Sequence, residues 1–159
     1  SFLAGMAHEA GFRVHVIDDR EKFASADRFP AGVQVVVEDI PAWLAGNELP
    51  ATAYAVIVTR GHRHDLDALR ALVPRNLRYV GLIGSRAKVK RVYDALLEEG
   101  IDPRALEPVH APIGLDIGAI TPQEIAVSIL AELIAVKHGK IAGPNATTAS
   151  MRWTEAIKS

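Results

Sequence analysis

Hydrophobic residues along this 159-residue chain alternate between short runs typical of β-strands and longer repeats typical of helices. Residues 1–10 resemble the second half of a helix, and Gly11 stands where a helix would end. Four short apolar runs follow, rich in β-branched residues, and a fifth and weaker candidate lies at 106–110. The four runs predict strands near 12–18, 33–38, 54–59 and 78–83.

Amphipathic segments lie between and after these runs, and they predict helices near 65–73, 86–98 and 122–138. Asp65 and Ser85 are suited to cap the first two helices. Thr121-Pro-Gln-Glu124 has the pattern of a capping box with proline at the first helical position. Alternating strands and helices indicate an α/β fold with a parallel sheet, of the Rossmann-like doubly wound type.

A doubly wound sheet begins with a strand and a Gly-rich turn, whereas this chain opens inside a helix. In that fold the first strand is central, between the strands expected at 12–18 and 54–59. We therefore expect an N-terminally truncated Rossmann-like domain over 1–139, lacking its first strand and Gly-rich turn. The two flanking strands should not pair, and about 9–10 Å, twice the ordinary strand spacing, should separate them unless another chain fills the gap. Residues 140–159 are expected to form a tail that is loose or docks through Trp153.

The composition indicates a single globular domain and argues against several other classes of protein. Apolar residues make up 49% of the chain, which is enough for one domain with a sizeable core. A formal net charge of -1 argues against recruitment by nucleic acid or membrane through bulk charge. The sequence has no cysteine, no signal-peptide pattern and no apolar run long enough to span a bilayer. We expect a cytoplasmic protein.

Gly-rich polar loops follow three of the apolar segments, and in a parallel sheet such loops meet at one edge. Arginine and lysine side chains gather in two of these loops, and glycines allow close backbone approach. Two predicted helix N-termini point the same way, which favours phosphate or a similar anion. The candidate residues are Arg60, Gly61, His62, Arg63, Gly84, Ser85, Arg86, Lys88 and, in the third loop, Asp116.

Other interpretations of the polar residues remain open. Asp18 and Asp19 end the strand at 12–18, where an acid can bind ribose hydroxyls or simply cap a turn. His62 and His64 have the spacing of a metal pair, which His110 and Asp116 could complete for a metal-dependent hydrolase. Arginines beside that pair would raise the electrostatic cost of binding a cation. Asp116 also fits a local turn.

Several segments of the chain closely resemble the XdhC/CoxI family, the maturation factors of xanthine dehydrogenase and related molybdenum hydroxylases. They extend over roughly 11–138 in the family's order and spacing. The matching segments are Val16-Ile-Asp-Asp-Arg20 with Arg28-Phe29-Pro30, Thr59-Arg-Gly-His-Arg-His-Asp65, Gly81-Leu-Ile-Gly-Ser-Arg-Ala-Lys88, Pro112-Ile-Gly-Leu-Asp-Ile-Gly118 and Thr121-Pro-Gln-Glu-Ile-Ala-Val-Ser-Ile-Leu-Ala-Glu132.

The resemblance implies a Rossmann-like C-terminal domain in a protein that binds molybdenum cofactor (molybdopterin). Such proteins protect the cofactor, support its sulfuration with a cysteine desulfurase as sulfur donor, and deliver it to the apo-enzyme. The family's Gly-Ala-Gly-His-type turn would stand just before Ser1, and its N-terminal region carries a cysteine. We expect a cofactor carrier that forms a homo-oligomer.

An NAD(P)-dependent oxidoreductase is the alternative function. Asp18 and Asp19 support it through their placement for a ribose. The sequence offers no tyrosine–lysine or histidine–aspartate pair in an obvious hydride-transfer role.

Overall fold

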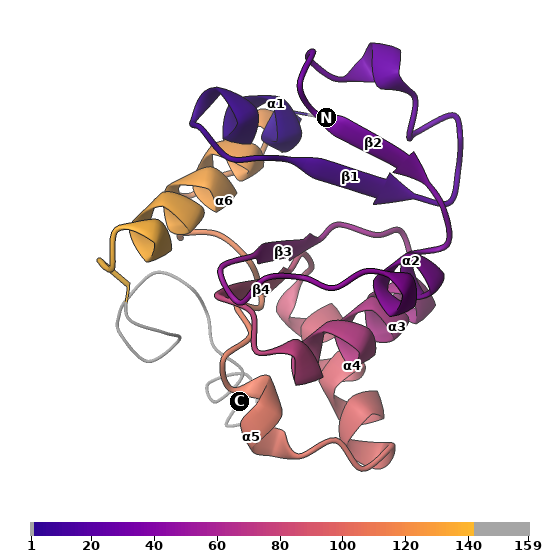
Figure 1. Cartoon of the computed structure of the whole chain (residues 1–159). Coiled ribbons are helices and arrows are strands. Elements are labelled where there is room, and N and C mark those ends of the chain that lie inside the picture. The colour runs from indigo at the N-terminus through magenta and orange to yellow at the C-terminus, as the bar shows by residue number, and fades with distance from the viewer. Residues whose placement is uncertain (1, 142–159) are drawn as a thin grey trace.

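The structure is a computed structural model that describes residues 2–141. Its helices and strands alternate along most of the chain (Figure 1). In order they are α1 (Phe2–Glu9), β1 (His15–Asp18), η1 (Ala26–Arg28), β2 (Gln34–Val37), α2 (Ile40–Gly46), β3 (Tyr54–Ile57), α3 (His62–Leu72), η2 (Val73–Arg75), β4 (Tyr79–Leu82), α4 (Arg86–Glu98), α5 (Pro103–Leu106) and α6 (Pro122–Lys137). The tail that we expected to dock through Trp153 lies outside the described residues.

The four strands form two parallel pairs rather than one continuous sheet. β1 pairs with β2 and β3 pairs with β4, both in parallel register. The predicted parallel α/β fold is therefore confirmed. β1 and β3 belong to separate sheets, as the missing central strand led us to expect.

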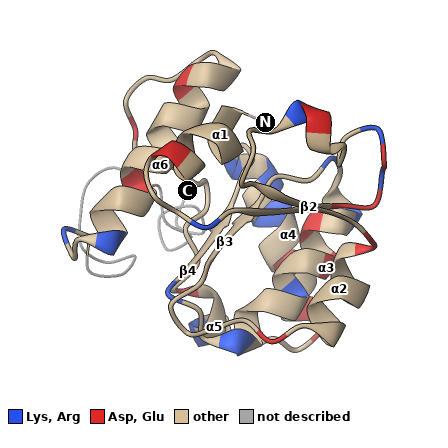
Figure 2. Ribbon diagram, turned by 45° about the horizontal axis from the view of Figure 1, so that its top comes forward, with Lys and Arg blue, Asp and Glu red and all other residues tan. Residues whose placement is uncertain are grey.

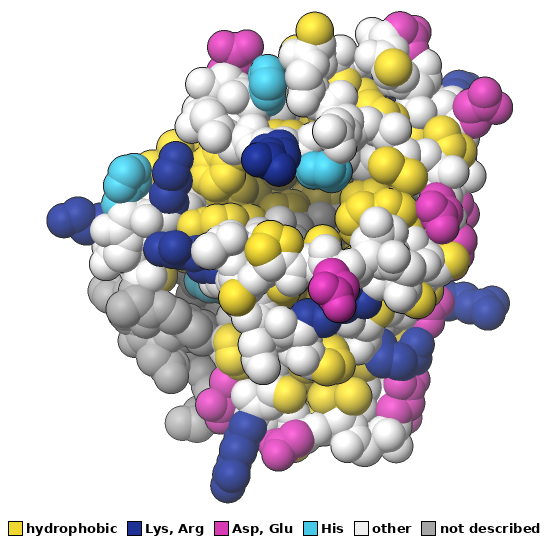
Figure 3. Space-filling view, in the orientation of Figure 1, with side chains coloured by type: hydrophobic (Ala, Val, Ile, Leu, Met, Phe, Trp, Pro, Cys, Tyr) yellow, Lys and Arg dark blue, Asp and Glu magenta, His cyan; other side chains and the backbone are white. Residues whose placement is uncertain are grey.

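A hollow separates the two pairs of strands. Figure 1 shows β1 and β2 lying together above β3 and β4, and the space-filling view shows a depression between them with hydrophobic side chains on its walls (Figure 3). We call residues 12–37, with β1 and β2, and residues 38–141, with β3 and β4, the two halves of the molecule. The halves remain connected elsewhere, because α1, which leads into β1, packs on α6, and the ring of Phe12 meets the ring of Tyr54 edge-on at 5.5 Å.

Alternating side chains of β3 and β4 supply two separate hydrophobic clusters, since successive residues of a strand point to opposite faces. Ile57, Val80 and Leu82 belong to the cluster formed with α2, α3 and α4. Tyr54 and Tyr79 belong to the cluster on the other face, formed largely with α6. The β3–β4 pair is thus covered on both faces, which explains the unbroken apolar character of its sequence.

Most helix boundaries agree with the sequence pattern. Ser85 caps α4 by accepting a hydrogen bond from the Lys88 backbone, and the predicted capping box opens α6. The predicted start of α3 at Asp65 is wrong, because the helix begins at His62 and Gly61 is its N-cap. Asp65 is instead held by side chains of neighbouring elements.

The candidate strand at 106–110 is also wrong for most of its length. Leu106 is the last residue of α5, and Pro108, which has no backbone N–H to donate, follows shortly after. Only His110 pairs with the sheet, through a parallel bridge to Gly81. The sequence analysis also missed α2, although Asp39 caps this helix and proline stands in its first turn.

Candidate anion-binding site at the carboxyl ends of the strands

Two glycine turns lead from the ends of β3 and β4 into helices. Gly61 has φ 104° and Gly84 has φ 155°, conformations that a side chain disfavours. α3 and α4 begin immediately after these turns, so their first backbone N–H groups lie at the carboxyl ends of the strands. Such helix N-termini favour anions. The predicted site residues on these turns are exposed, namely Arg60, His62, Arg63, Ser85 and Arg86.

A buried aspartate ties the two turns together. Asp65 has 0% of its surface exposed. The hydroxyl of Thr59, after β3, donates to its Oδ1 at 2.5 Å. Lys88 Nζ, from α4, lies 2.6 Å from its Oδ2 and also donates to the Ile83 carbonyl at 3.3 Å. Lys88 is therefore committed to this ion pair and is not a free cation for a ligand.

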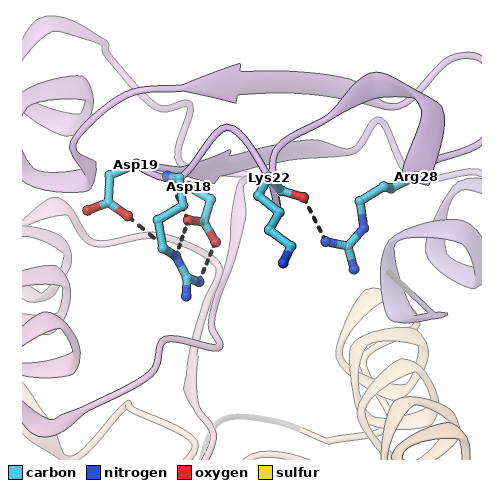
Figure 4. Close-up of polar contacts among 5 residues, drawn as sticks. Asp18, Asp19, Lys22 and Arg28 are labelled. Atoms are coloured by element: carbon cyan, nitrogen blue, oxygen red, sulfur yellow. Dashed lines mark hydrogen bonds and ion pairs between the residues drawn. The ribbon is translucent and has the colours of Figure 1, made fainter.

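The acids at the end of β1 are engaged as well. Arg20 donates to both carboxylate oxygens of Asp18, from Nε to Oδ1 at 2.8 Å and from a terminal nitrogen to Oδ2 at 2.9 Å. These hydrogen bonds lower the pKa of the Asp18 carboxyl below its usual value. Asp19 is more exposed, and its Oδ1 lies 3.7 Å from the Arg20 Nε (Figure 4). Of the two acids that could bind a ribose, Asp19 has the carboxylate that is more accessible to a ligand.

Phe23 joins the loop after β1 to the loop after β3. Three guanidinium groups lie over its ring, with Cζ to centroid distances of 4.1 Å for Arg20, 5.2 Å for Arg28 and 5.0 Å for Arg60. The β1–β2 connection carries basic and acidic residues side by side, and basic residues also lie along α4 (Figure 2). Phe23 and Arg28 were not among the predicted site residues. The only signal for Arg28 in the sequence was the segment Arg28-Phe29-Pro30, which contributed to the family resemblance, and Phe23 lies outside the matching segments.

The third predicted loop starts beside the end of β4. The backbone N–H of Ile113 donates to the carbonyl of Leu82 at 3.0 Å, which places the start of this loop at the carboxyl edge. The Ser128 hydroxyl of α6 then donates to the Leu115 carbonyl at 2.6 Å. Asp116 is exposed further along the loop. Within 2–141 its carboxylate makes no ion pair that would link it to the arginine-bearing turns.

Sequence reasoning also missed a buried polar cluster formed by β4, α6 and His110. Glu132 of α6 is fully buried and accepts a hydrogen bond from the Tyr79 hydroxyl at 2.5 Å. His110 Nδ1 lies 3.1 Å from the same carboxylate, and its ring stacks on Tyr79 with centroids 4.5 Å apart. Burial, followed by the charge of Glu132, raises the pKa of Tyr79 above its usual value.

This cluster corrects the proposed metal set. His110 is buried and committed to Glu132, whereas His62 and His64 are exposed at the start of α3. No group of three or more potential ligands among His, Asp and Glu comes together in the described part of the chain. The set that His110 and Asp116 could have completed with His62 and His64 therefore does not come together within residues 2–141.

No helix within residues 2–141 is long and apolar enough to cross a membrane.

Comparison with known proteins identifies relatives over most of the chain. The family described as the XdhC Rossmann domain matches residues 1–133. The chain is 35% identical over 137 residues to a Bacillus subtilis protein named as a probable xanthine dehydrogenase subunit. It is 32% identical over 142 residues to an Escherichia coli protein named uncharacterized protein YqeB. These alignments include 85% and 89% of the chain, but only 39% and 26% of the two relatives.

A solved structure shares the fold. The crystal structure of a Bacillus halodurans protein described as a xanthine dehydrogenase superposes with a TM-score of 0.74 at 29% identity. The match includes 87% of this chain and 39% of that protein. The chain thus spans well under half the length of the relatives it matches.

Proposed function

Because the chain belongs to the XdhC Rossmann-domain family, we propose that it acts in the maturation of a xanthine dehydrogenase or a related molybdenum hydroxylase. In this role it holds molybdenum cofactor, protects it, and presents it for sulfuration by a cysteine desulfurase and for delivery to the apo-enzyme. The names of the Bacillus relatives support a link to xanthine dehydrogenase. A homo-oligomeric carrier remains part of the proposal.

The observation that carries the proposal is the pair of glycine turns with exposed arginines. Molybdopterin carries a phosphate group, and the two helix N-termini together with Arg60, Arg63 and Arg86 suit such an anion. These residues therefore fit the anionic part of the cofactor. When bound, the cofactor supplies the molybdenum centre that the hydroxylase uses, whereas the residues of this chain bind and orient it.

Direct binding and transfer test the proposal. The chain, purified with released molybdenum cofactor under anaerobic conditions, should co-elute with the cofactor on gel filtration. The loaded protein should then restore activity to apo-xanthine dehydrogenase faster than free cofactor does. If the cofactor elutes separately and the apo-enzyme is not restored, the proposed function is wrong.

Charge reversal locates the binding residues. Arg60→Glu and Arg86→Glu should each weaken cofactor binding while changing the free energy of unfolding by only about 0–1 kcal/mol, because both side chains are exposed. Arg13→Glu is the matched control, since Arg13 is exposed before the amino end of β1. A large fall in melting temperature with unchanged affinity would show that the two arginines are structural.

The second candidate function is an NAD(P)-dependent oxidoreductase. The exposed Asp19 at the end of β1 favours it, because an acid at this position can bind ribose hydroxyls. Calorimetric titration of the chain with NAD and with NADP separates the two candidates. Saturable heat with either dinucleotide supports the oxidoreductase, and two blank titrations remove it.

A further inference from the structure

The three arginines over Phe23 come from two different halves of the molecule. Arg20 and Arg28 belong to the connection between β1 and β2, whereas Arg60 follows β3. Both Arg28 and Arg60 are exposed, and the ring of Phe23 is half-buried between them and the protein. Arginines from the loops of two separate sheets therefore contact the same aromatic ring.

The charges of this cluster are only partly neutralised. Arg20 is paired with Asp18. Arg28 donates to the Lys22 backbone carbonyl at 2.9 Å, but neither Arg28 nor Arg60 has an ion-pair partner within the described chain. Two guanidiniums over one ring lie within roughly a Debye length of each other, about 10 Å at 0.1 M salt, so their charges repel. An anion between them would relieve that repulsion.

We propose that Arg28 and Arg60, supported by Phe23, form a phosphate-binding site that bridges the two halves of the molecule. The inference deepens the proposed function and rests on it for the identity of the natural ligand, since it adds Arg28 and Phe23 to Arg60 among the groups that hold that ligand's phosphate. Guanidinium forks bind phosphate oxygens in a bidentate manner. Contact with the Phe23 ring holds both forks in place before the ligand arrives.

The surroundings of the site favour phosphate over a ligand that has no charge. Lys22 and Arg28 project to the same side of the β1–β2 pair, so a third cation stands next to the cluster (Figure 4). Asp18 does not oppose an anion strongly, because both of its oxygens are occupied by Arg20. The same connection also carries exposed acids: Asp19 lies on the Arg20 side, Glu21 precedes Lys22, and the carboxylate of Asp27 accepts a hydrogen bond from the Ser25 hydroxyl.

Inorganic pyrophosphate is the probe, because it presents phosphate oxygens without a ring or a ribose. Isothermal titration of the full chain should give saturable binding, and Arg28→Gln and Arg60→Gln should each weaken it about tenfold or more. Arg13→Gln is the matched control for loss of one positive charge and should leave the affinity within about twofold. Within residues 2–141 the Arg60 side chain makes no hydrogen bond or ion pair, so Arg60→Gln removes the positive charge and its contact with the Phe23 ring and leaves the hydrogen bonds of the loop in place.

Several results would overturn the site. No saturable binding, or equal weakening by all three substitutions, would show that only bulk charge attracts the anion. Unchanged affinity in Arg28→Gln and Arg60→Gln would place any bound phosphate elsewhere. Titrations with ADP distinguish the source of the phosphate. If ADP competes with pyrophosphate and binds more weakly to Arg28→Gln and Arg60→Gln, the site accepts the phosphate of a nucleotide-type ligand.

The two proposals fail in different ways. If molybdenum cofactor co-elutes with the chain but Arg28→Gln and Arg60→Gln retain it fully, the carrier function stands and the phosphate site is wrong. If pyrophosphate binding follows Arg28 and Arg60 but the cofactor does not co-elute, the site stands and the natural ligand is a different phosphate ester.

Discussion

The two parallel pairs of strands have the same geometry but very different packing. Every residue of β4 is buried, whereas no residue of β1 or β2 is. We refer to residues 12–37 as the β1–β2 half and to residues 38–141 as the β3–β4 half. The β3–β4 half has helices on both faces of its strands. The β1–β2 half contributes one fully buried hydrophobic residue, Ala24.

The difference shows that burial in a parallel sheet comes from its neighbours rather than from strand sequence alone. Val16, Ile17, Val35 and Val36 are as apolar as the residues of β4, yet all four are only half-buried, whereas every residue of β4 is buried. The edges of β1 and β3 that a central strand would join are unpaired with each other. The phosphate site proposed above lies at the end of this gap, where Phe23 and Arg60 reach across it.

The largest expected contrast between the halves concerns their ion pairs. Lys88→Met leaves the fully buried Asp65 without its cation, and unfolding free energy should fall by about 3 kcal/mol or more. Arg20→Met removes the partner of Asp18, but Arg20 is exposed and solvent screens this pair, so the free energy of unfolding should fall far less. Urea titrations followed by circular dichroism measure both.

A double variant serves as the control for this contrast. Asp65→Asn with Lys88→Met removes both charges, so it should recover part of the stability that Lys88→Met loses. Equal losses in Lys88→Met and Arg20→Met would contradict the view that the β3–β4 half alone has a dry interior.

A matched pair of apolar substitutions tests the same difference between the two halves through the packing of their strands. Ile57→Ala in β3 should lower the free energy of unfolding by about 2–5 kcal/mol, because this side chain is 4% exposed and its removal leaves a cavity. Ile17→Ala in β1 deletes the same atoms from a half-buried side chain, and about 1–2 kcal/mol is expected. A similar loss in both variants would mean that the hollow beside β1 is filled in solution.

The fold was predictable where local chemistry and packing agree. Ser85 and Thr121 mark helix starts through hydrogen bonds within their own turns, and α4 and α6 begin where these residues indicate. The parallel pairing of β3 and β4 followed from their apolar runs and intervening helix. These features depend on residues that are close in sequence or on general rules of topology.

The features that sequence analysis missed depend on distant partners. Asp65 has the chemistry of a helix cap, but Thr59 and Lys88 engage its carboxylate and α3 starts earlier. His110 looked like a metal ligand because nothing in the sequence places Glu132 beside it. The loop residues Arg60 and Arg86 were found from position alone, and whether they bind a cofactor remains a prediction.

The last expected effect concerns alkaline pH, and it sharpens the comparison because all three tyrosines of the chain lie in the β3–β4 half. Burial raises the pKa of both Tyr79 and Tyr93 above the usual value, and for Tyr79 the charge of Glu132 adds to it. A group whose pKa is raised by folding contributes stability below its unfolded pKa, which is about 10 for tyrosine. That contribution is lost as pH rises above 10, because the unfolded chain releases the proton and the folded chain keeps it. Tyr79 and Tyr93 should therefore each lower the free energy of unfolding in that range, by up to about 1.4 kcal/mol per pH unit.

Tyr79→Phe isolates one of these contributions. The variant loses the hydrogen bond to Glu132 and is less stable at neutral pH, so the informative quantity is the slope of unfolding free energy against pH. Urea titrations at a series of pH values above 10 should give a slope that is shallower than that of the unmodified chain by about 1.4 kcal/mol per pH unit. The Arg20→Met variant, altered in the β1–β2 half, should keep the original slope over the same range, because Asp18 is ionised throughout it. An unchanged slope in Tyr79→Phe would show that the Tyr79 hydroxyl ionises as readily in the folded protein as in water, and the cluster around Glu132 would then have to be open to solvent.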